Sequence, residues 1–246
     1  MTMRGPMRSG PQLPYDVIAG IVPSRRGWLT ATAKSHGATI APEEPQVLST
    51  FTEVLDYKPA YRVIAVALPI GLPDEPSPGG RACEHEARRL LGLPRSNAIA
   101  STPTRAALSC DDYEQAALAN GGGLSPIRWR QRRRILEIDD AIAPYWQRTV
   151  FEVHPELTFF QLNADAPLRL RKRTPLGSEE RKELLVQRLP GVERLLDASL
   201  PGVYRYQLYD AAACLWTARR ILARAVARLP EHPEWNNLGL RMEIVR

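Results

Sequence analysis

RTVFEVHPELTFFQL, residues 148–162, predicts a β-strand that turns directly into a helix. Thr149–Val153 is rich in β-branched and aromatic residues, and the following proline prevents a simple helical continuation. Side chains alternate along a strand, so Glu152 and His154 are expected on the same face. A carboxylate and an imidazole at a strand end, with Glu156 opening the next helix, favour metal binding or acid-base chemistry. A solvated edge strand followed by a helix-start acid that the helix dipole favours explains the same residues without chemistry.

The length and termini predict one domain without a membrane segment. The 246 residues are enough for a large α/β domain with a hydrophobic core. We expect residues 1–14, which hold charges and prolines but no apolar core, to be a disordered tail, and residues 15–246 to be a single domain. No apolar run reaches the roughly 18 residues that would suggest a membrane span, so we expect a cytoplasmic protein. The three cysteines are odd in number and far apart, which fits a reducing compartment and argues against disulfides or a zinc knuckle.

The basic charge is weak evidence for a nucleic-acid partner. The net charge is +6, carried almost wholly by arginine. The lysines are Lys34, Lys58, Lys172 and Lys182. Abundant Arg, Ala, Pro and Leu with little Lys indicates codon bias in a GC-rich bacterial genome.

Hydrophobic patterns predict an α/β fold with an antiparallel hairpin at its start and a helix-rich C-terminal half. The expected strands are residues 16–22, 28–34, 46–48, 62–68, 149–153 and 240–246. The expected helices are residues 49–56 with Ser49 as cap, 80–92, 111–120 with Asp111 as cap, 125–142, 178–189 with Ser178 as cap, and 203–229. A five-residue loop at 23–27 joins the first two strands, and residues 93–109 read as a long surface loop. The continuous apolar run at 62–68 is typical of a central strand covered on both faces.

Two basic segments and one acid are candidate functional features. The 125–142 helix carries Arg128, Arg130, Arg132, Arg133 and Arg134. These arginines predict either a phosphate-binding surface or a solvated face that pairs with the acids at 137, 139 and 140. A second basic run occupies the loop at 166–177, APLRLRKRTPLG. Asp210 stands too deep in the last helix for the helix dipole to explain it, and it either pairs with an arginine or has a function.

An ordered set of motifs resembles the family catalogued as domain of unknown function 429, described as predicted nucleases with an RNase H-like fold. The matching pieces are GIVPSRRGW (20–28), AVALPIGLPD (65–74), RACEHEARRLLG (81–92), TPTRAAL (102–108), ILEIDDAI (135–142), FEVHPELTFFQLN (151–163), KRTPLG (172–177) and DAAACLWTARR (210–220). Each piece alone is a weak signal. Together they occur in the family's order and span nearly the whole chain after residue 15.

The resemblance implies a mixed five-stranded sheet with helices on both faces and a site for Mg²⁺ or Mn²⁺. Such ions take oxygen ligands, and a pair of them can clamp the attacking water and the leaving oxygen of a phosphodiester. Carried over to this chain, the third acid is Glu152 and the acid of the last helix is Asp210. Two acids of the family pattern are replaced, by Val22 and by Ala67. The resemblance therefore leaves two negative charges to meet the four positive charges of a metal pair.

Other polar residues of the family pattern are present, namely Glu84, Arg105, Arg148, His154, Glu156 and Lys172. Under the resemblance, Arg105, Arg148 and Lys172 are expected to bind substrate phosphates. His154 would orient Glu152 or a water, and Glu84 and Glu156 would be further polar site residues.

Three hypotheses follow from these residues. The first is an inactivated RNase H-like protein that binds nucleic acid or a protein without metal. The second is a rewired phosphodiesterase that uses Glu152, His154 and Asp210 with Mg²⁺ or Mn²⁺. The third is an interaction subunit that contacts a protein or nucleic acid through the arginine-rich helix at 128–134.

Overall fold

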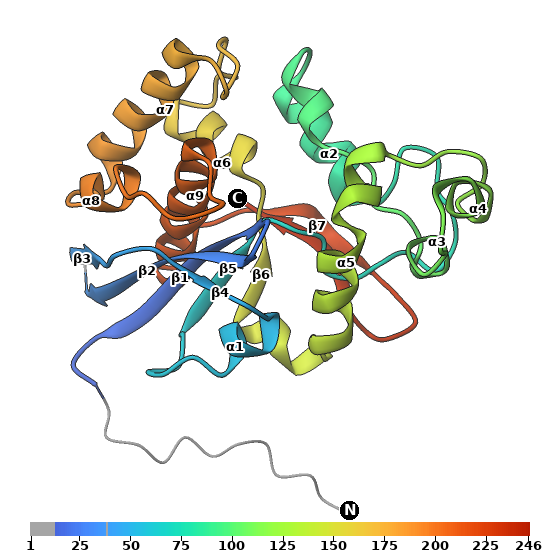
Figure 1. Ribbon diagram of the computed structural model, residues 1–246, viewed down its shortest axis with the longest axis horizontal. Coiled ribbons are helices and arrows are strands. Elements are labelled where there is room, and N and C mark those ends of the chain that lie inside the picture. The colour runs from blue at the N-terminus through green and yellow to red at the C-terminus, as the bar shows by residue number, and fades with distance from the viewer. Residues whose placement is uncertain (1–12, 38) are drawn as a thin grey trace, which may run out of the picture.

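A mixed β-sheet forms the centre of the computed structural model, which describes residues 13–37 and 39–246 (Figure 1). The strand order is β3-β2-β1-β5-β6, and β4 pairs with β2 beside β3. Strands β1 to β4 are joined antiparallel, whereas β1, β5 and β6 run parallel. The bounds are β1 Asp16–Ser24, β2 Gly27–His36, β3 Thr39–Pro42, β4 Gln46–Leu48, β5 Val63–Val66 and β6 Val150–Glu152. Residues 1–12 of the expected tail lie outside the described residues.

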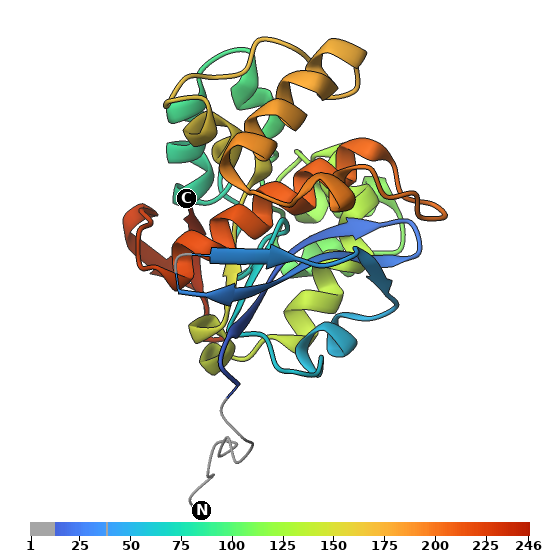
Figure 2. The same ribbon diagram turned by 90° about the vertical axis from the view of Figure 1, so that its left-hand side faces the viewer.

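Helices cover both faces of this sheet (Figure 2). One face carries α9 with α7 and α8, and the other carries α1 and α5. The bounds are α1 Phe51–Leu55, α2 Ala82–Leu91, η1 Arg95–Ala98, α3 Arg105–Leu108, α4 Tyr113–Ala119, α5 Pro126–Ala141, η2 Pro144–Arg148, α6 Pro155–Leu162, α7 Pro175–Arg188, α8 Glu193–Leu196 and α9 Arg205–Leu222. The α/β class expected from the sequence is confirmed, and this layered arrangement is compatible with an RNase H-like fold.

Residue alternation decides which layer each strand side chain enters. In β1, Ile18 and Val22 face α9, whereas Val17 and Ile21 face α1 and α5. Gly20 lies where α9 crosses β1, and an added Cβ would come within 2.1 Å of the backbone nitrogen of Leu215. The glycine therefore lets the helix lie directly on the strand.

The first hairpin is tighter than expected. Ser24 pairs with Gly27, so the turn between β1 and β2 is only Arg25 and Arg26. The expected five-residue loop was wrong because Pro23 continues the strand at its end, with Trp28 as its partner.

Several helix starts also differ from the expected caps, because side-chain oxygens of neighbouring residues accept the first helical N–H groups. The caps are Thr50 rather than Ser49, Asp112 rather than Asp111, and Thr174 rather than Ser178. The expected loop at 93–109 contains η1 and the short helix α3. Strand β3 was not expected from the sequence.

The C-terminal hairpin corrects the expected last helix. Helix α9 ends at Leu222, and β7 (Arg228–Trp235) pairs antiparallel with β8 (Arg241–Val245). Sequence patterns missed β7 because Pro230 and Pro233 interrupt it, and its pairing shifts register between Leu229 and Glu234. The final strand was expected and is confirmed. Across the described residues, the structure has no helix both long and apolar enough to span a membrane.

Candidate functional site

Glu152, at the end of β6, is held in a buried ion pair. Its Oε1 accepts a hydrogen bond from Arg81 Nη2 at 2.6 Å, and its Oε2 accepts one from Arg81 Nη1 at 2.8 Å. The backbone N–H of Ile70 donates to the same Oε2 at 2.8 Å. Both carboxylate oxygens of Glu152 are therefore engaged by protein donors.

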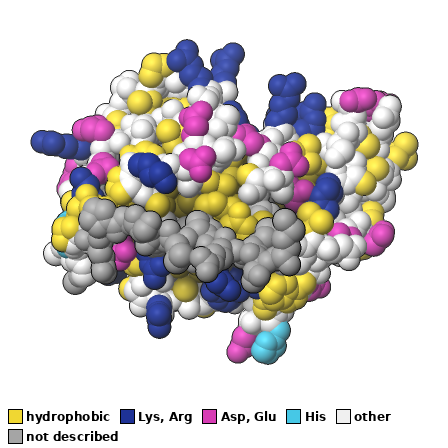
Figure 3. All heavy atoms as spheres, turned by 90° about the horizontal axis from the view of Figure 1, so that it is seen from below, with side chains coloured by type: hydrophobic (Ala, Val, Ile, Leu, Met, Phe, Trp, Pro, Cys, Tyr) yellow, Lys and Arg dark blue, Asp and Glu magenta, His cyan; other side chains and the backbone are white. Residues whose placement is uncertain are grey.

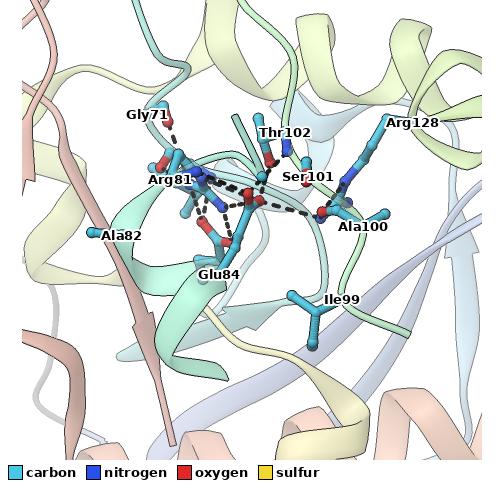
Figure 4. A network of polar contacts seen from close by, with 12 residues as sticks. Gly71, Arg81, Ala82, Glu84, Ile99, Ala100, Ser101, Thr102 and Arg128 are labelled. Atoms are coloured by element: carbon cyan, nitrogen blue, oxygen red, sulfur yellow. Dashed lines mark hydrogen bonds and ion pairs between the residues drawn. The ribbon is translucent and has the colours of Figure 1, made fainter. Parts of the chain in front are cut away.

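Arg81 is the centre of this arrangement (Figure 4). It precedes α2 and is one of the largest fully buried side chains among the described residues. Besides Glu152, its guanidinium donates to Glu84 Oε1 at 3.1 Å and to the carbonyl oxygens of Ile70 and Gly71. One side chain thus ties the start of α2 to the end of β6 and to the segment after β5.

Glu84 is equally surrounded. It accepts hydrogen bonds from the backbone N–H and the hydroxyl of Thr102, and Arg128 of α5 lies 3.8 Å away. Arg128 also donates to the carbonyl oxygen of Ala100. We call Arg81, Glu84, Arg128 and Glu152 the Arg81 network, and its two acids are balanced by two arginines.

The Arg81 network is held in its ionised form. Burial raises the pKa of Glu152, and Arg81 opposes that effect. Burial also acts to raise the pKa of Glu84, but Arg81, Arg128 and Thr102 outweigh it and lower the pKa. Burial acts to lower the pKa of Arg81, yet the neighbouring acidic groups raise it well above its ordinary value. Two short charge-assisted bonds are typical of a guanidinium and a carboxylate, so we assign Glu152 as ionised.

Asp210 belongs to a second group of charges. Its Oδ2 accepts a hydrogen bond from Lys172 Nζ at 2.6 Å, while its Oδ1 is buried without a hydrogen-bond partner among the described residues. Burial raises the pKa of Asp210, and Lys172 opposes the effect. Glu156 lies close enough to raise the pKa of both Asp210 and Lys172. Its carboxylate pairs with buried Arg181 at 2.9 Å. We call Lys172, Asp210, Glu156 and Arg181 the Lys172 network, which is likewise charge-balanced.

His154 lies between the two networks and caps α6. Its Nδ1 accepts the backbone N–H of Glu156 at 3.2 Å, which places the proton of a neutral ring on Nε2. Burial, together with Arg128 and Lys172, lowers its pKa to about 4 against the opposing effect of Glu156. At neutral pH the ring is therefore uncharged, and its nearest role is to begin the helix that carries Glu156.

The replaced acid positions lie on the α9 side of the sheet. Val22 and Ala67 both pack in the core beneath α9, the helix that carries Asp210. Glu152 points to the other side of the sheet. Its chain neighbours Phe151 and Val153 face α9, and side chains alternate along a strand, so Glu152 faces away from α9. The alternation thus sends Glu152 towards the Arg81 network, while the Val22 and Ala67 positions stay with Asp210.

The residues present do not fit a pair of divalent ions. Val22 and Ala67 offer no oxygen ligands, and the carboxylates of Glu152 and Asp210 already carry the cations Arg81 and Lys172. Within residues 13–37 and 39–246, no group of three or more His, Cys, Asp and Glu side chains is arranged to hold a metal. The donor set therefore disagrees with the metal site that the family resemblance implied.

Two of the expected phosphate-binding arginines lie elsewhere. Arg105 at the start of α3 pairs with Asp139 of α5 at 2.5 Å. Arg148 is exposed and precedes β6, so it lies at the opposite end of that strand from Glu152. Only Lys172 of the three expected phosphate ligands adjoins a network described above.

Three of the arginines of helix α5 make contacts within the fold. Arg128 is buried in the Arg81 network, Arg132 stacks over Trp129 at 4.0 Å, and Arg134 pairs with Glu137 at 2.7 Å. The face in Figure 3 likewise shows Lys and Arg side chains interspersed with Asp and Glu. A phosphate-binding or protein-binding role of this helix stays a prediction.

Sequence reasoning missed Arg81, Thr102 and Arg181 as site residues. The spacing of Arg81 and Glu84 across the start of α2 was an available signal, because an arginine three residues before a glutamate can pair with it. Arg181 has no such local signal, since its partner Glu156 comes from another helix.

A cavity of about 770 Å³ opens beside the Lys172 network. It is lined by Lys172, Arg173, Thr174, Pro175, Ser178, Glu179, Tyr204, Arg205 and Tyr206. These residues come from the start of α7 and the start of α9. Its volume lies in the range of small-molecule sites.

One family model matches the chain, that of the family described as Protein of unknown function (DUF429), over residues 16–235. The match begins with β1 and ends with β7, so it includes both networks and the cavity. No curated protein and no solved structure matches the chain.

Proposed function

The chain belongs to the family of proteins of unknown function DUF429, and from this premise we propose that it binds nucleic acid without metal-dependent cleavage. The protein would use its cations to hold phosphate groups. It would leave the phosphodiester bond intact, as an inactivated relative of RNase H-like nucleases.

The charge balance of the two networks carries this proposal. Each carboxylate that the resemblance assigns to metal has a protein cation within 2.6 Å, namely Arg81 for Glu152 and Lys172 for Asp210. Two divalent ions would add four positive charges where the neighbouring acids are already neutralised. Bringing them in would require Glu152 to leave buried Arg81, which would then keep only Glu84 as a paired carboxylate.

Phosphate binding is supported by the cations that line the cavity. Arg173 and Arg205 are exposed there, and Lys172 stands at the border between the cavity and Asp210. Arginine binds phosphate oxygens in a bidentate manner, and lysine binds them as a point charge.

One observation favours a second candidate, the rewired phosphodiesterase. Asp210 Oδ1 is buried and has no hydrogen-bond partner within the described part of the chain, as a ligand oxygen awaiting an ion would be. That function requires Lys172 to leave Asp210, and Glu152 would have to turn from Arg81.

The two candidates are separated by one experiment on the full chain. Fluorescently labelled single-stranded and double-stranded oligonucleotides are titrated with protein in EDTA and in Mg²⁺ or Mn²⁺ at equal ionic strength, and the oligonucleotides are then analysed on denaturing gels. We expect equal affinity with and without metal, and intact oligonucleotide. A metal-dependent cut that disappears in Glu152→Gln or Asp210→Asn would overturn the proposal and favour the phosphodiesterase.

Matched variants locate the binding surface. The double variant Arg173→Gln/Arg205→Gln removes exposed arginines at the cavity, and Arg130→Gln/Arg133→Gln removes exposed arginines from α5. Only the first pair is expected to weaken binding and to reduce its dependence on salt. The reverse result would move the binding surface to α5.

A further inference from the structure

Two tyrosines at the start of α9 form a flat platform at the cavity. Tyr204 and Tyr206 are stacked, with ring centroids 5.6 Å apart and planes inclined by 10°. Tyr204 is 64% exposed, so one face of this ring pair is open to solvent. An exposed, stacked aromatic ring beside a cavity is a surface onto which a further planar group can stack.

Polar contacts fix this platform to the central sheet. The backbone N–H of Tyr204 donates to Gln207 Oε1 at 2.9 Å. Gln207 Nε2 in turn donates to the carbonyl oxygen of Pro23, at the end of β1, also at 2.9 Å. The start of α9 is therefore held in place before any ligand arrives, which lowers the entropic cost of binding.

Positive charge surrounds the same platform. Arg173 Cζ lies 4.9 Å from the centre of the Tyr206 ring, and Lys172 Nζ lies 5.3 Å from it. The 14-residue helix α7 begins at Pro175, and Thr174 caps it by accepting the N–H of Gly177. The positive end of the α7 dipole thus adds to two side-chain cations at one wall of the cavity.

We infer that the cavity holds one nucleotide of a single-stranded nucleic acid, with its base stacked on Tyr204 and its phosphate beside Arg173 and the start of α7. This inference rests on the proposed function and specifies its ligand. A paired duplex keeps its bases stacked inside, so only an unpaired base can reach Tyr204. A free nucleotide offers the same chemistry, and the experiment below separates the two sources.

Glu179 offers a substitution that should strengthen binding, whereas loss of a cavity arginine or of Tyr204 should weaken it. It is the acid that lines the cavity, where Lys172, Arg173 and Arg205 are the cations. A carboxylate facing a phosphate weakens its binding, so Glu179→Gln should bind a single strand several-fold more tightly. Unchanged or weaker binding in Glu179→Gln would contradict the placement of the phosphate.

The base-stacking step is tested with Tyr204→Ala in anisotropy titrations of a labelled single-stranded oligonucleotide in EDTA. Loss of a base-aromatic stack should weaken binding on the order of 10-fold, whereas Tyr204→Phe keeps the ring and should bind as the unchanged protein does. Tyr145→Ala is the matched control, because Tyr145 is 60% exposed on η2, away from the cavity. Equal affinity of Tyr204→Ala and Tyr145→Ala would overturn the inference.

Three ligands complete the test: a single strand, the same sequence as a duplex, and a mononucleotide. We expect the single strand to bind most tightly, and the duplex to be unaffected by Tyr204→Ala. If a mononucleotide binds as tightly as the strand, the ligand is a free nucleotide and the inference of a single-stranded nucleic acid is overturned. If the strand binds uncut but ignores Tyr204, the inference fails and the proposed function stands. If the strand is cut in Mg²⁺, the proposed function fails instead.

Discussion

The Arg81 network and the Lys172 network carry the same charges and differ in their access to solvent. Arg81 and Glu84 are fully buried, and both carboxylate oxygens of Glu152 accept hydrogen bonds from the protein. In the Lys172 network the lysine side chain is 32% exposed, and one oxygen of Asp210 has no hydrogen-bond partner among the residues that the structure describes. A saturated ion network fixes neighbouring segments, whereas an unsaturated one at a cavity leaves groups for a ligand.

This difference assigns separate roles to two acids that the family resemblance placed in one site. Glu152 serves the junction of α2, β6 and the segment after β5. Asp210 orients Lys172 at the border of the cavity. Four substitution experiments test this division, beginning with the largest expected effect.

Arg81→Met should destabilise the protein most. The change leaves Glu84 and Glu152 buried without their shared cation, which costs about 3–5 kcal/mol of unfolding free energy. Urea denaturation measures the loss, and Arg133→Met on the exposed side of α5 is the control, expected to change stability by less than about 0.5 kcal/mol. A loss below about 1 kcal/mol in Arg81→Met would mean that the Arg81 network is not structural.

Val22→Asp/Ala67→Asp restores the two missing acids and should create a dependence on divalent metal. Buried carboxylates repel Asp210, so we expect a loss of about 2 kcal/mol or more without metal and a partial recovery in Mg²⁺. Val22→Asn/Ala67→Asn has the same shape without the charge and should not respond to Mg²⁺. Thermal unfolding with and without Mg²⁺ checks both variants. Failure of the aspartate variant to respond would show that these positions do not converge with Asp210.

His154, between the networks, should make the protein sensitive to mild acid. Its pKa is about 4 in the folded chain, below the ordinary value of 6.5, so the unfolded chain binds more protons between these values. The contribution of neutral His154 to the free energy of unfolding is therefore fully present above pH 6.5 and is lost as the pH falls towards 4. The His154 side chain is partly exposed, so we expect the total loss of unfolding free energy from this residue to be on the order of 1–3 kcal/mol. His154→Gln should lose less stability than the unchanged chain between pH 6.5 and 5 in urea denaturation, and identical losses would exclude this role.

Lys172→Met should have the smallest effect on stability. Asp210 itself is buried, but the Lys172 side chain is 32% exposed, so water can enter the space that the lysine leaves and we expect a loss of about 1–2 kcal/mol. Lys182→Met, which removes an exposed pair with Asp197, is the control and should cost less than about 0.5 kcal/mol. A loss in Lys172→Met as large as that in Arg81→Met would remove the distinction between the networks.

Local patterns predicted the strands of the central sheet except β3, but they did not predict the charge partners. The apolar runs at β1 and β5 predicted strands, and the run at β5 predicted a strand covered on both faces, because burial acts directly on those side chains. The hairpin strand β7 escaped prediction because its prolines interrupt the strand pattern. Glu152 and Asp210 were singled out by local patterns and were placed in one site by the family resemblance, but their cations depend on which helices meet in space. No short-range pattern in the sequence encodes the pairs formed by Lys172 with Asp210 or by Arg181 with Glu156.

Titration of Mn²⁺ into the unchanged full chain, followed by electron paramagnetic resonance of the free ion, tests the central claim most directly. If protein cations already neutralise Glu152 and Asp210, no saturable Mn²⁺ site tighter than about 1 mM should be present. Two Mn²⁺ ions bound per chain, and lost in Asp210→Asn, would contradict the account.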